Sequence, residues 1–296
     1  MKRVIIMAAV SVASLTAGTA RAQLSEYGIE GMGVVSTRAD EGRASVAPDG
    51  RRIVWDSDRG GGAGGRDLWQ AVLREGRWAD AAPLPINSPA DESAPFLSAD
   101  GRWLYFVSNR PGGHGGGDLY RAAVLAEGGF GPVENLGPGV NTRGDEAAPT
   151  LSRDGRRLLF ASDGHGGAGG FDLFVARRDE SAFVEPRPLP GIDSAQDETD
   201  AAWLQDGRAL VFARSREAGA AVRLHLAHCR GGAYADVQPL ALSFNTAEGR
   251  TSGPVVDAGK PSELLVAGSA RAPKAGGLDI YRMRAPPADG DGDCLR

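Results

Sequence analysis

The sequence predicts an all-β fold, a five-bladed β-propeller of four-stranded blades. Two observations lead to this prediction. A pattern of about 50 residues repeats five times, and the 43 glycines and 18 prolines of the 296-residue chain cluster between short apolar runs. These clusters of glycine and proline favour strands and turns over long helices. A repeat that contains four strands is typical of a propeller blade.

Each repeat begins with a polar motif that ends in acidic residues. An apolar or small residue is followed by Asn, Ser or Asp, then by Ser or Thr, and shortly afterwards by the acids. The successive glutamates are 51, 54, 52 and 50 residues apart. The acidic residues are Asp40, Glu41, Asp91, Glu92, Asp145, Glu146, Asp197, Glu198 and, alone in the fifth copy, Glu248.

The order of strands within a repeat follows from its turns. Asp-Gly comes eight residues after each of the first four glutamates, at Asp49, Asp100, Asp154 and Asp206, and predicts a hairpin because glycine accepts a positive φ. The second strand is continuously apolar, which indicates burial on both faces, as between stacked sheets. A glycine-rich loop and two further strands complete each repeat.

The two ends of the chain complement each other. The last repeat stops after its third strand, and residues 27–32 resemble the missing fourth strand. We therefore expect an N-terminal strand to complete the last blade and close the ring, which removes exposed strand edges. Residues 23–284 are expected to form one propeller domain, and residues 285–296 a flexible acidic tail.

The N-terminus has the features of a signal peptide. Lys2 and Arg3 precede an apolar stretch, and Ala20-Arg21-Ala22 resembles a cleavage site, which predicts removal of residues 1–22 and a periplasmic or secreted protein. No other stretch approaches the length of a membrane span, about 20 apolar residues. The mature chain would carry a formal charge of −8 with scattered arginines, which argues against nucleic acid as a partner. We expect a monomer.

The repeats resemble a known family. Residues 94–110 and 115–120 are similar to the Pro-Asp variety of WD-like propeller repeat found in TolB-like periplasmic proteins and beside OmpA-type domains. TolB itself has an α/β domain before a six-bladed propeller, and neither that domain nor an OmpA-type domain fits here. The resemblance implies a stand-alone TolB-like propeller, and it extends to the propeller gates of tricorn and prolyl-oligopeptidase proteases.

The acidic pairs have two interpretations. They precede the innermost strands and could ring one mouth of the central channel, where they would bind a cation or a basic peptide. Alternatively, each pair holds its own blade by accepting backbone N–H groups or an arginine such as Arg59 or Arg110. We favour the second interpretation, because a feature that is copied in every unit usually serves the unit.

A residue that is not copied gives a sharper hypothesis. Two positions after the five glutamates stand Arg43, Ala94, Ala148, Asp200 and Arg250. If the ring closes, Asp200, Arg250 and Arg43 belong to consecutive blades and form a charged arc on one side of the channel. The arc is a hypothetical contact for a ligand or a partner's tail, and its simpler alternative is an internal salt bridge.

The sequence favours a non-enzymatic module that binds an envelope protein or peptide. It has no Gly-x-Ser-x-Gly nucleophile motif, and no cofactor is implied. The alternative is a carbohydrate-active propeller, a glycosidase or lectin with an axial carboxylate pocket, in which Asp200 would be the catalytic candidate.

The remaining candidates concern metal and sulfur. No metal site is predicted, because the histidines lack a placed third ligand and the acidic run at 289–293 lacks the closing glutamate of a calcium loop. Cys229 and Cys294, the two cysteines of the chain, either form a disulfide that ties the tail to the fourth repeat or stay free.

Overall fold

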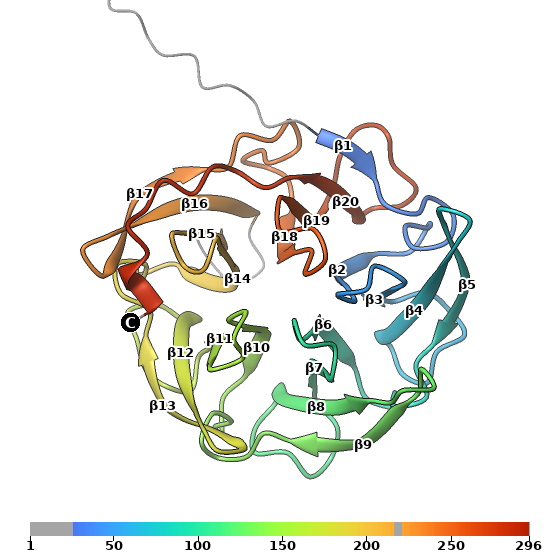
Figure 1. Cartoon of the computed structure of the whole chain (residues 1–296), viewed down its shortest axis with the longest axis horizontal. Helices are drawn as coiled ribbons and strands as arrows, with labels where there is room; N and C mark the ends of the chain where they lie inside the picture. Colours follow the sequence, from blue (N-terminus) through green and yellow to red (C-terminus); the bar gives the residue numbers. More distant parts are fainter. Residues whose placement is uncertain (1–25, 216–220, 296) are drawn as a thin grey trace, which may run out of the picture.

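The protein is a five-bladed β-propeller (Figure 1). The computed structural model describes residues 26–215 and 221–295. Within them, twenty strands form five four-stranded antiparallel sheets around a central axis, which confirms the predicted fold. The predicted signal peptide, residues 1–22, lies outside the described residues, which contain no helix long and apolar enough to cross a membrane.

Blades one to four each run from the innermost to the outermost strand along the chain. Blade one consists of β2 (Glu41–Val46), β3 (Arg52–Ser57), β4 (Asp67–Arg74) and β5 (Arg77–Pro83). Blade two consists of β6 (Glu92–Leu97), β7 (Trp103–Ser108), β8 (Asp118–Val124) and β9 (Phe130–Asn135). Blade three consists of β10 (Glu146–Leu151), β11 (Arg157–Ser162), β12 (Asp172–Asp179) and β13 (Ala182–Pro188). Blade four consists of β14 (Asp197–Leu204), β15 (Ala209–Ser215), β16 (Val222–Arg230) and β17 (Ala233–Pro239).

Blade five is assembled from both ends of the chain. Its inner strands are β18 (Thr251–Val256), β19 (Glu263–Gly268) and β20 (Asp279–Arg284), and its outer strand is β1 (Glu26–Ile29), which pairs antiparallel with β20. The prediction that an N-terminal strand completes the last blade is confirmed. The two ends of the chain are joined by hydrogen bonds within this one sheet, which closes the ring.

The Asp-Gly turns adopt the conformation that the sequence requires. Gly50, Gly101, Gly155 and Gly207 have φ of 70°, 70°, 68° and 89°, values that residues with a Cβ rarely adopt. These turns join the innermost strand to the second strand of blades one to four, at one end of the propeller, which we call the turn face. The acidic motifs precede the innermost strands and therefore lie at the opposite end.

The hydrophobic core is divided into five clusters, one between each pair of adjacent blades. The second strands supply side chains to the clusters on both sides, and Leu104, Tyr105 and Phe106 of β7 are all fully buried. This double burial explains why these strands are continuously apolar rather than alternating.

The chain after blade five is held against blade four. A disulfide joins Cys229 of β16 to Cys294, which lies in a short 3₁₀ helix at Asp293–Leu295. Ala288 is buried, and the Asp291 amide donates a hydrogen bond to the Cys229 carbonyl (3.1 Å). Of the two alternatives for the cysteines the structure has the disulfide, and it attaches the segment that was expected to be a flexible tail to blade four.

We expect the disulfide to stabilise the propeller by closing a loop whose ends are 65 residues apart. Replacement of both cysteines by alanine should lower the free energy of unfolding by about 2–4 kcal/mol, because the cross-link restricts the unfolded chain. Urea denaturation with and without reductant measures this effect. Reductant should destabilise the wild type and leave the double variant unchanged, and equal sensitivity of the two proteins would contradict the prediction.

Candidate functional site

The repeated glutamates are buried and hold their own blades together through hydrogen bonds. Glu92 accepts hydrogen bonds from the Ser88 amide (2.8 Å) and hydroxyl (2.5 Å), from the Ser108 hydroxyl (2.8 Å) and from Arg110 (3.0 Å). Glu41 is held in the same way by Thr37, Ser57 and Arg59. Burial raises the pKa of Glu41, and the hydrogen bonds from Thr37 and the charge of Arg59 oppose that shift.

The repeated aspartates join neighbouring blades. Asp91 accepts a hydrogen bond from the backbone amide of Arg66 in blade one (2.9 Å), and its own amide donates to Asn109 (2.8 Å). The same contact from the preceding blade reaches three further aspartates, Asp40, Asp145 and Asp197. Both acids of each pair therefore have partners within the protein, which supports the structural interpretation rather than a ring of ligands around the channel.

Loss of one such glutamate should destabilise the ring. Glu92→Ala removes the carboxylate that accepts from Arg110 and from two serine hydroxyls, so we expect a loss of about 3 kcal/mol or more in the free energy of unfolding. The measurement is urea denaturation. Glu185→Ala is the control, because this exposed glutamate pairs with Arg177 at the surface, and its effect should be distinctly smaller. Equal losses would contradict the assignment.

Arg43 spans the central channel. It extends from β2 of blade one, donates to the Pro149 carbonyl (3.1 Å) and the Thr150 hydroxyl of blade three, and lies 3.7 Å from the Asp200 carboxylate of blade four. Its guanidinium is 6.0 Å from the centroid of the Phe96 ring of blade two. Arg43 is only 2% exposed. Through these contacts it links blades one to four at the axis.

Asp200 is the partner of Arg43 and is incompletely satisfied. Its Oδ1 is buried and has no hydrogen-bond donor among the described residues. Burial raises the pKa of Asp200 to about 7, although the positive charge of Arg43 lowers it. The carboxyl therefore keeps its proton to a higher pH than an exposed aspartate does.

The structure does not bring Arg250 into this pair. In blade five Thr251 pairs with Gly268, the register that Glu41 and Ser57 have in blade one. Gly253 is consequently the counterpart of Arg43, while Arg250 is exposed at the start of the strand. The predicted three-residue arc is thus a two-residue contact, because in the fifth copy the acid, Glu248, comes three residues before the position that the buried glutamates occupy.

Glu248 is also displaced from the predicted ring. It is exposed in the loop before β18, and Thr251 occupies the place of the buried glutamates. The Thr251 hydroxyl donates to the Phe244 carbonyl (3.2 Å) and so fastens the motif without a charge.

The raised pKa of Asp200 predicts a pH-dependent stability. The unfolded carboxyl has a pKa near 3.8 and the folded one about 7, so the folded state binds the proton more tightly. Stability from this group is fully present below about pH 4 and is lost as the pH rises towards 7, by at most about 1.4 kcal/mol per pH unit. The difference in unfolding free energy between wild type and Asp200→Asn, measured from pH 4 to 8, should show this slope. A constant difference would refute it.

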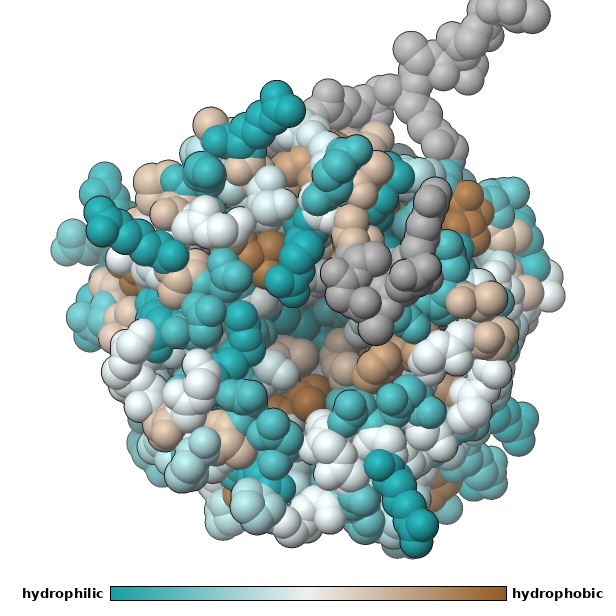
Figure 2. All heavy atoms as spheres, turned by 180° about the vertical axis from the view of Figure 1, so that it is seen from behind, coloured by the Kyte–Doolittle hydropathy of each residue, from teal (hydrophilic) through white to brown (hydrophobic). Residues whose placement is uncertain are grey.

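An apolar cup opens at the centre of the turn face. It has a volume of about 330 Å³ and is lined by the ends of the inner strands of blades two to five. Its apolar walls include Phe96, Leu151, Trp203, Val256 and Pro261. The face opposite to that seen in Figure 1 also has a hollow at its centre (Figure 2).

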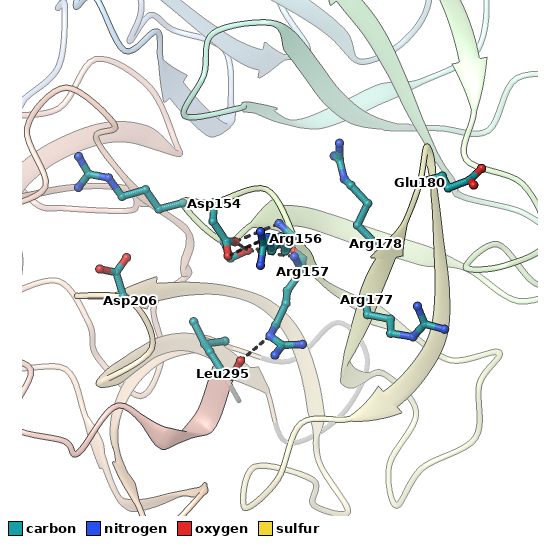
Figure 3. A pocket seen from close by; sticks show the side chains of 10 residues that line it. Asp154, Arg156, Arg157, Arg177, Arg178, Glu180, Asp206 and Leu295 are labelled. Atoms are coloured by element: carbon teal, nitrogen blue, oxygen red, sulfur yellow. Dashed lines mark hydrogen bonds and ion pairs between the residues drawn. The ribbon is translucent and has the colours of Figure 1, made fainter.

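An arginine-rich cleft adjoins the cup (Figure 3). It has a volume of about 880 Å³, and it shares Ser152, Arg153, Asp206 and Leu295 with the cup. Five arginines line it against three acids, Asp154, Glu180 and Asp206. The arginines are Arg153, Arg156, Arg157, Arg177 and Arg178.

The arginines of the cleft differ in their availability. Arg157 donates to the Leu295 carbonyl (2.5 Å), Arg177 is paired with Glu185, and Arg178 donates to the hydroxyl of Tyr105. Two others are free for a ligand: the Arg153 side chain has no partner in the described part of the chain, and Arg156 makes only a 4.0 Å contact with Asp154.

The sequence alone does not reveal this cleft. Its arginines are scattered along the chain, but the β10–β11 turn lies beside the end of β12, so residues 153–157 meet residues 177–178. The adjacent arginine pairs at 156–157 and 177–178 were the available signal. Arg157 of β11 is paired with Arg177 of β12, so the two arginine pairs meet through the register of these strands, which the sequence pattern did not specify.

No protein-family model and no curated protein matches the sequence. The fold defines the chain as a five-bladed β-propeller, and solved propellers are similar to it. A TolB-like protein of Agrobacterium tumefaciens aligns with a TM-score of 0.52 and 18% identity over 83% of this chain and 74% of its own. An endo-arabinase of Bacteroides thetaiotaomicron aligns with a TM-score of 0.54 and 12% identity over 87% of this chain and 98% of its own. At such identities the likeness shows the fold alone.

Proposed function

We propose that this protein is a non-enzymatic interaction module of the cell envelope, and that its turn face binds an extended acidic segment of a partner protein. The observation that carries the proposal is the junction of the arginine-rich cleft with the apolar cup. A cleft with more arginines than acids stands out in a chain whose formal net charge is −5. Clefts lined by one sign of charge concentrate ligands of the opposite sign.

The two cavities suit different parts of one peptide. Arg153 and Arg156 present guanidinium groups that can bind carboxylates in a bidentate manner. The cup beside them can accept an apolar or aromatic side chain, which would pack against Phe96 and Trp203. A segment in which acidic residues precede or follow a large apolar residue would fill both cavities.

The proposed location in the envelope has separate support. The N-terminal sequence has the charge, the apolar stretch and the small residues of a signal peptide. The disulfide between Cys229 and Cys294 is of the kind that persists in oxidising compartments.

Charge reversal of the free arginines should weaken peptide binding. We expect Arg153→Glu/Arg156→Glu to reduce the affinity for an Asp/Glu-rich peptide that contains one tryptophan by about 10-fold or more, because attraction becomes repulsion at two positions. Fluorescence anisotropy of a labelled peptide at two salt concentrations measures this loss. Wild-type binding should weaken with salt.

Arg74→Glu is the matched control, because Arg74 is an exposed arginine paired with Asp80 on blade one. It should leave peptide affinity unchanged. The same three proteins then serve as bait in a crosslinking pull-down from envelope extract. A partner that is captured by wild type and by the Arg74 variant, and lost with the double variant, would be the expected result. Equal capture by all three would refute the turn face as the binding surface.

A carbohydrate-active propeller is the second candidate. Asp200 has a pKa of about 7 at the axis, and Asp56 nearby is paired with Arg66 (2.5 Å), so two carboxyls occupy unlike environments. The fold is also that of the endo-arabinase. However, only 10% of the Asp200 side chain is exposed and Arg43 lies against it, which leaves little room for a sugar. Glycan hydrolysis that is abolished by Asp200→Asn would favour this candidate.

A further inference from the structure

Three carboxylates meet at the seam between blades three and four. Asp172 begins β12 of blade three, Glu198 lies in β14 of blade four, and Asp193 lies in the loop that joins the two blades. One carboxylate oxygen from each residue lies within 4.8 Å of the other two. Asp172 and Glu198 are fully buried, whereas Asp193 is exposed.

This composition departs from the other seams. The position of Asp193 is held by Asn87, Asn141 and Asn245 in three other copies of the motif. Asn87 accepts from the Leu68 amide (3.1 Å) and donates to the Leu68 carbonyl (2.9 Å), and the other two asparagines make the same reciprocal pair. An ionised aspartate cannot donate, so it cannot replace this pair. Asp193 instead accepts from the Ala168 amide (3.0 Å).

A second observation points to a missing ligand. The Oε2 atom of Glu41, Glu92 and Glu146 accepts the backbone amide of the Thr or Ser four residues earlier. The Oε2 atom of Glu198 is buried and has no hydrogen-bond partner in the described chain, and Asp172 Oδ1 is in the same state. The aspartate oxygen is also unpartnered at Asp118, so the distinguishing feature is the glutamate.

We propose that Asp172, Asp193 and Glu198 bind a divalent cation, Ca²⁺. Arg214 contacts Glu198 Oε1 (2.6 Å) and offsets one of the three negative charges, so a divalent ion would balance the cluster. Ca²⁺ accepts carboxylate oxygens at about 2.3–2.6 Å in flexible geometry, whereas Mg²⁺ demands a near-ideal octahedron, so three carboxylates that come from two blades and the loop between them suit Ca²⁺ better. The exposed Asp193 leaves one side open for water ligands.

The bound cation would connect two blades. Asp172 belongs to blade three and Glu198 to blade four, so coordination by both adds a bond across this seam, where Asp193 lacks the reciprocal hydrogen bonds of an asparagine. Binding to the folded state alone stabilises it in proportion to the logarithm of the cation concentration.

The test is calcium binding by the purified protein after treatment with a chelator and dialysis. Titration calorimetry with CaCl₂ should show one ion per chain. The midpoint of thermal unfolding should rise by about 5–10 °C when Ca²⁺ exceeds its Kd by about 100-fold. Equal MgCl₂ should produce less than half of this rise. No binding and no rise in the wild type would overturn the proposal.

The chain itself supplies the variants. Asp193→Asn introduces the asparagine that stands at this position in three other seams. Asp193→Ser introduces the serine that stands there, as Ser36, at the seam between blades five and one. Both should lose calorimetric binding and the thermal shift while folding normally. Asp80→Asn, which removes one exposed carboxylate from blade one, should retain both.

Two outcomes would overturn the assignment. Undiminished Ca²⁺ binding by Asp193→Asn and Asp193→Ser would place the ion elsewhere. Alternatively, a proton could occupy the cluster, because burial and the neighbouring Asp193 raise the pKa of Asp172 to about 7. In that case acidification through pH 7 would stabilise the wild type relative to Asp193→Asn, and CaCl₂ would have no effect on either protein.

Discussion

The propeller depends on how each blade is fastened to the next. The acidic motif before the inner strand of blades one to four does this with two side chains: the glutamate is buried and accepts hydrogen bonds from side chains of its own blade, and the aspartate accepts an amide from the preceding blade. In three seams an asparagine adds a reciprocal pair of hydrogen bonds to the third strand of the preceding blade. Because the hydrophobic clusters also lie between blades, packing and polar contacts act at the same five seams.

This arrangement separates structure from function along the sequence. The residues that repeat have partners inside the ring, so the residues available for binding are those that break the pattern. Arg43 is one such residue, although its side chain already contacts three other blades across the channel. Asp193, which replaces an asparagine, and the free Arg153 are others.

Blade three carries both proposed binding regions. Asp172 is the first residue of β12, and Arg177 and Arg178 stand near its other end, so the proposed cation site and the arginine-rich cleft lie at opposite ends of one strand. The cleft is also bordered by Leu295, which the disulfide at Cys294 holds near blade four. The C-terminal segment thereby forms part of the proposed binding surface rather than a free extension.

The sequence by itself determined the blade number, the strand order, the Asp-Gly turns and the closure by an N-terminal strand, because these depend on local patterns that recur at a fixed spacing. It also favoured the structural interpretation of the acidic pairs. Only the tertiary structure decided the position of Arg250, since the acid of the fifth motif is displaced from the first residue of the strand and the strand pairing alone reveals this. The arginine-rich cleft, the orphaned oxygen of Glu198 and the choice of a disulfide over free cysteines likewise required the fold, because each depends on side chains that are distant in sequence and that strand pairing or blade packing brings together.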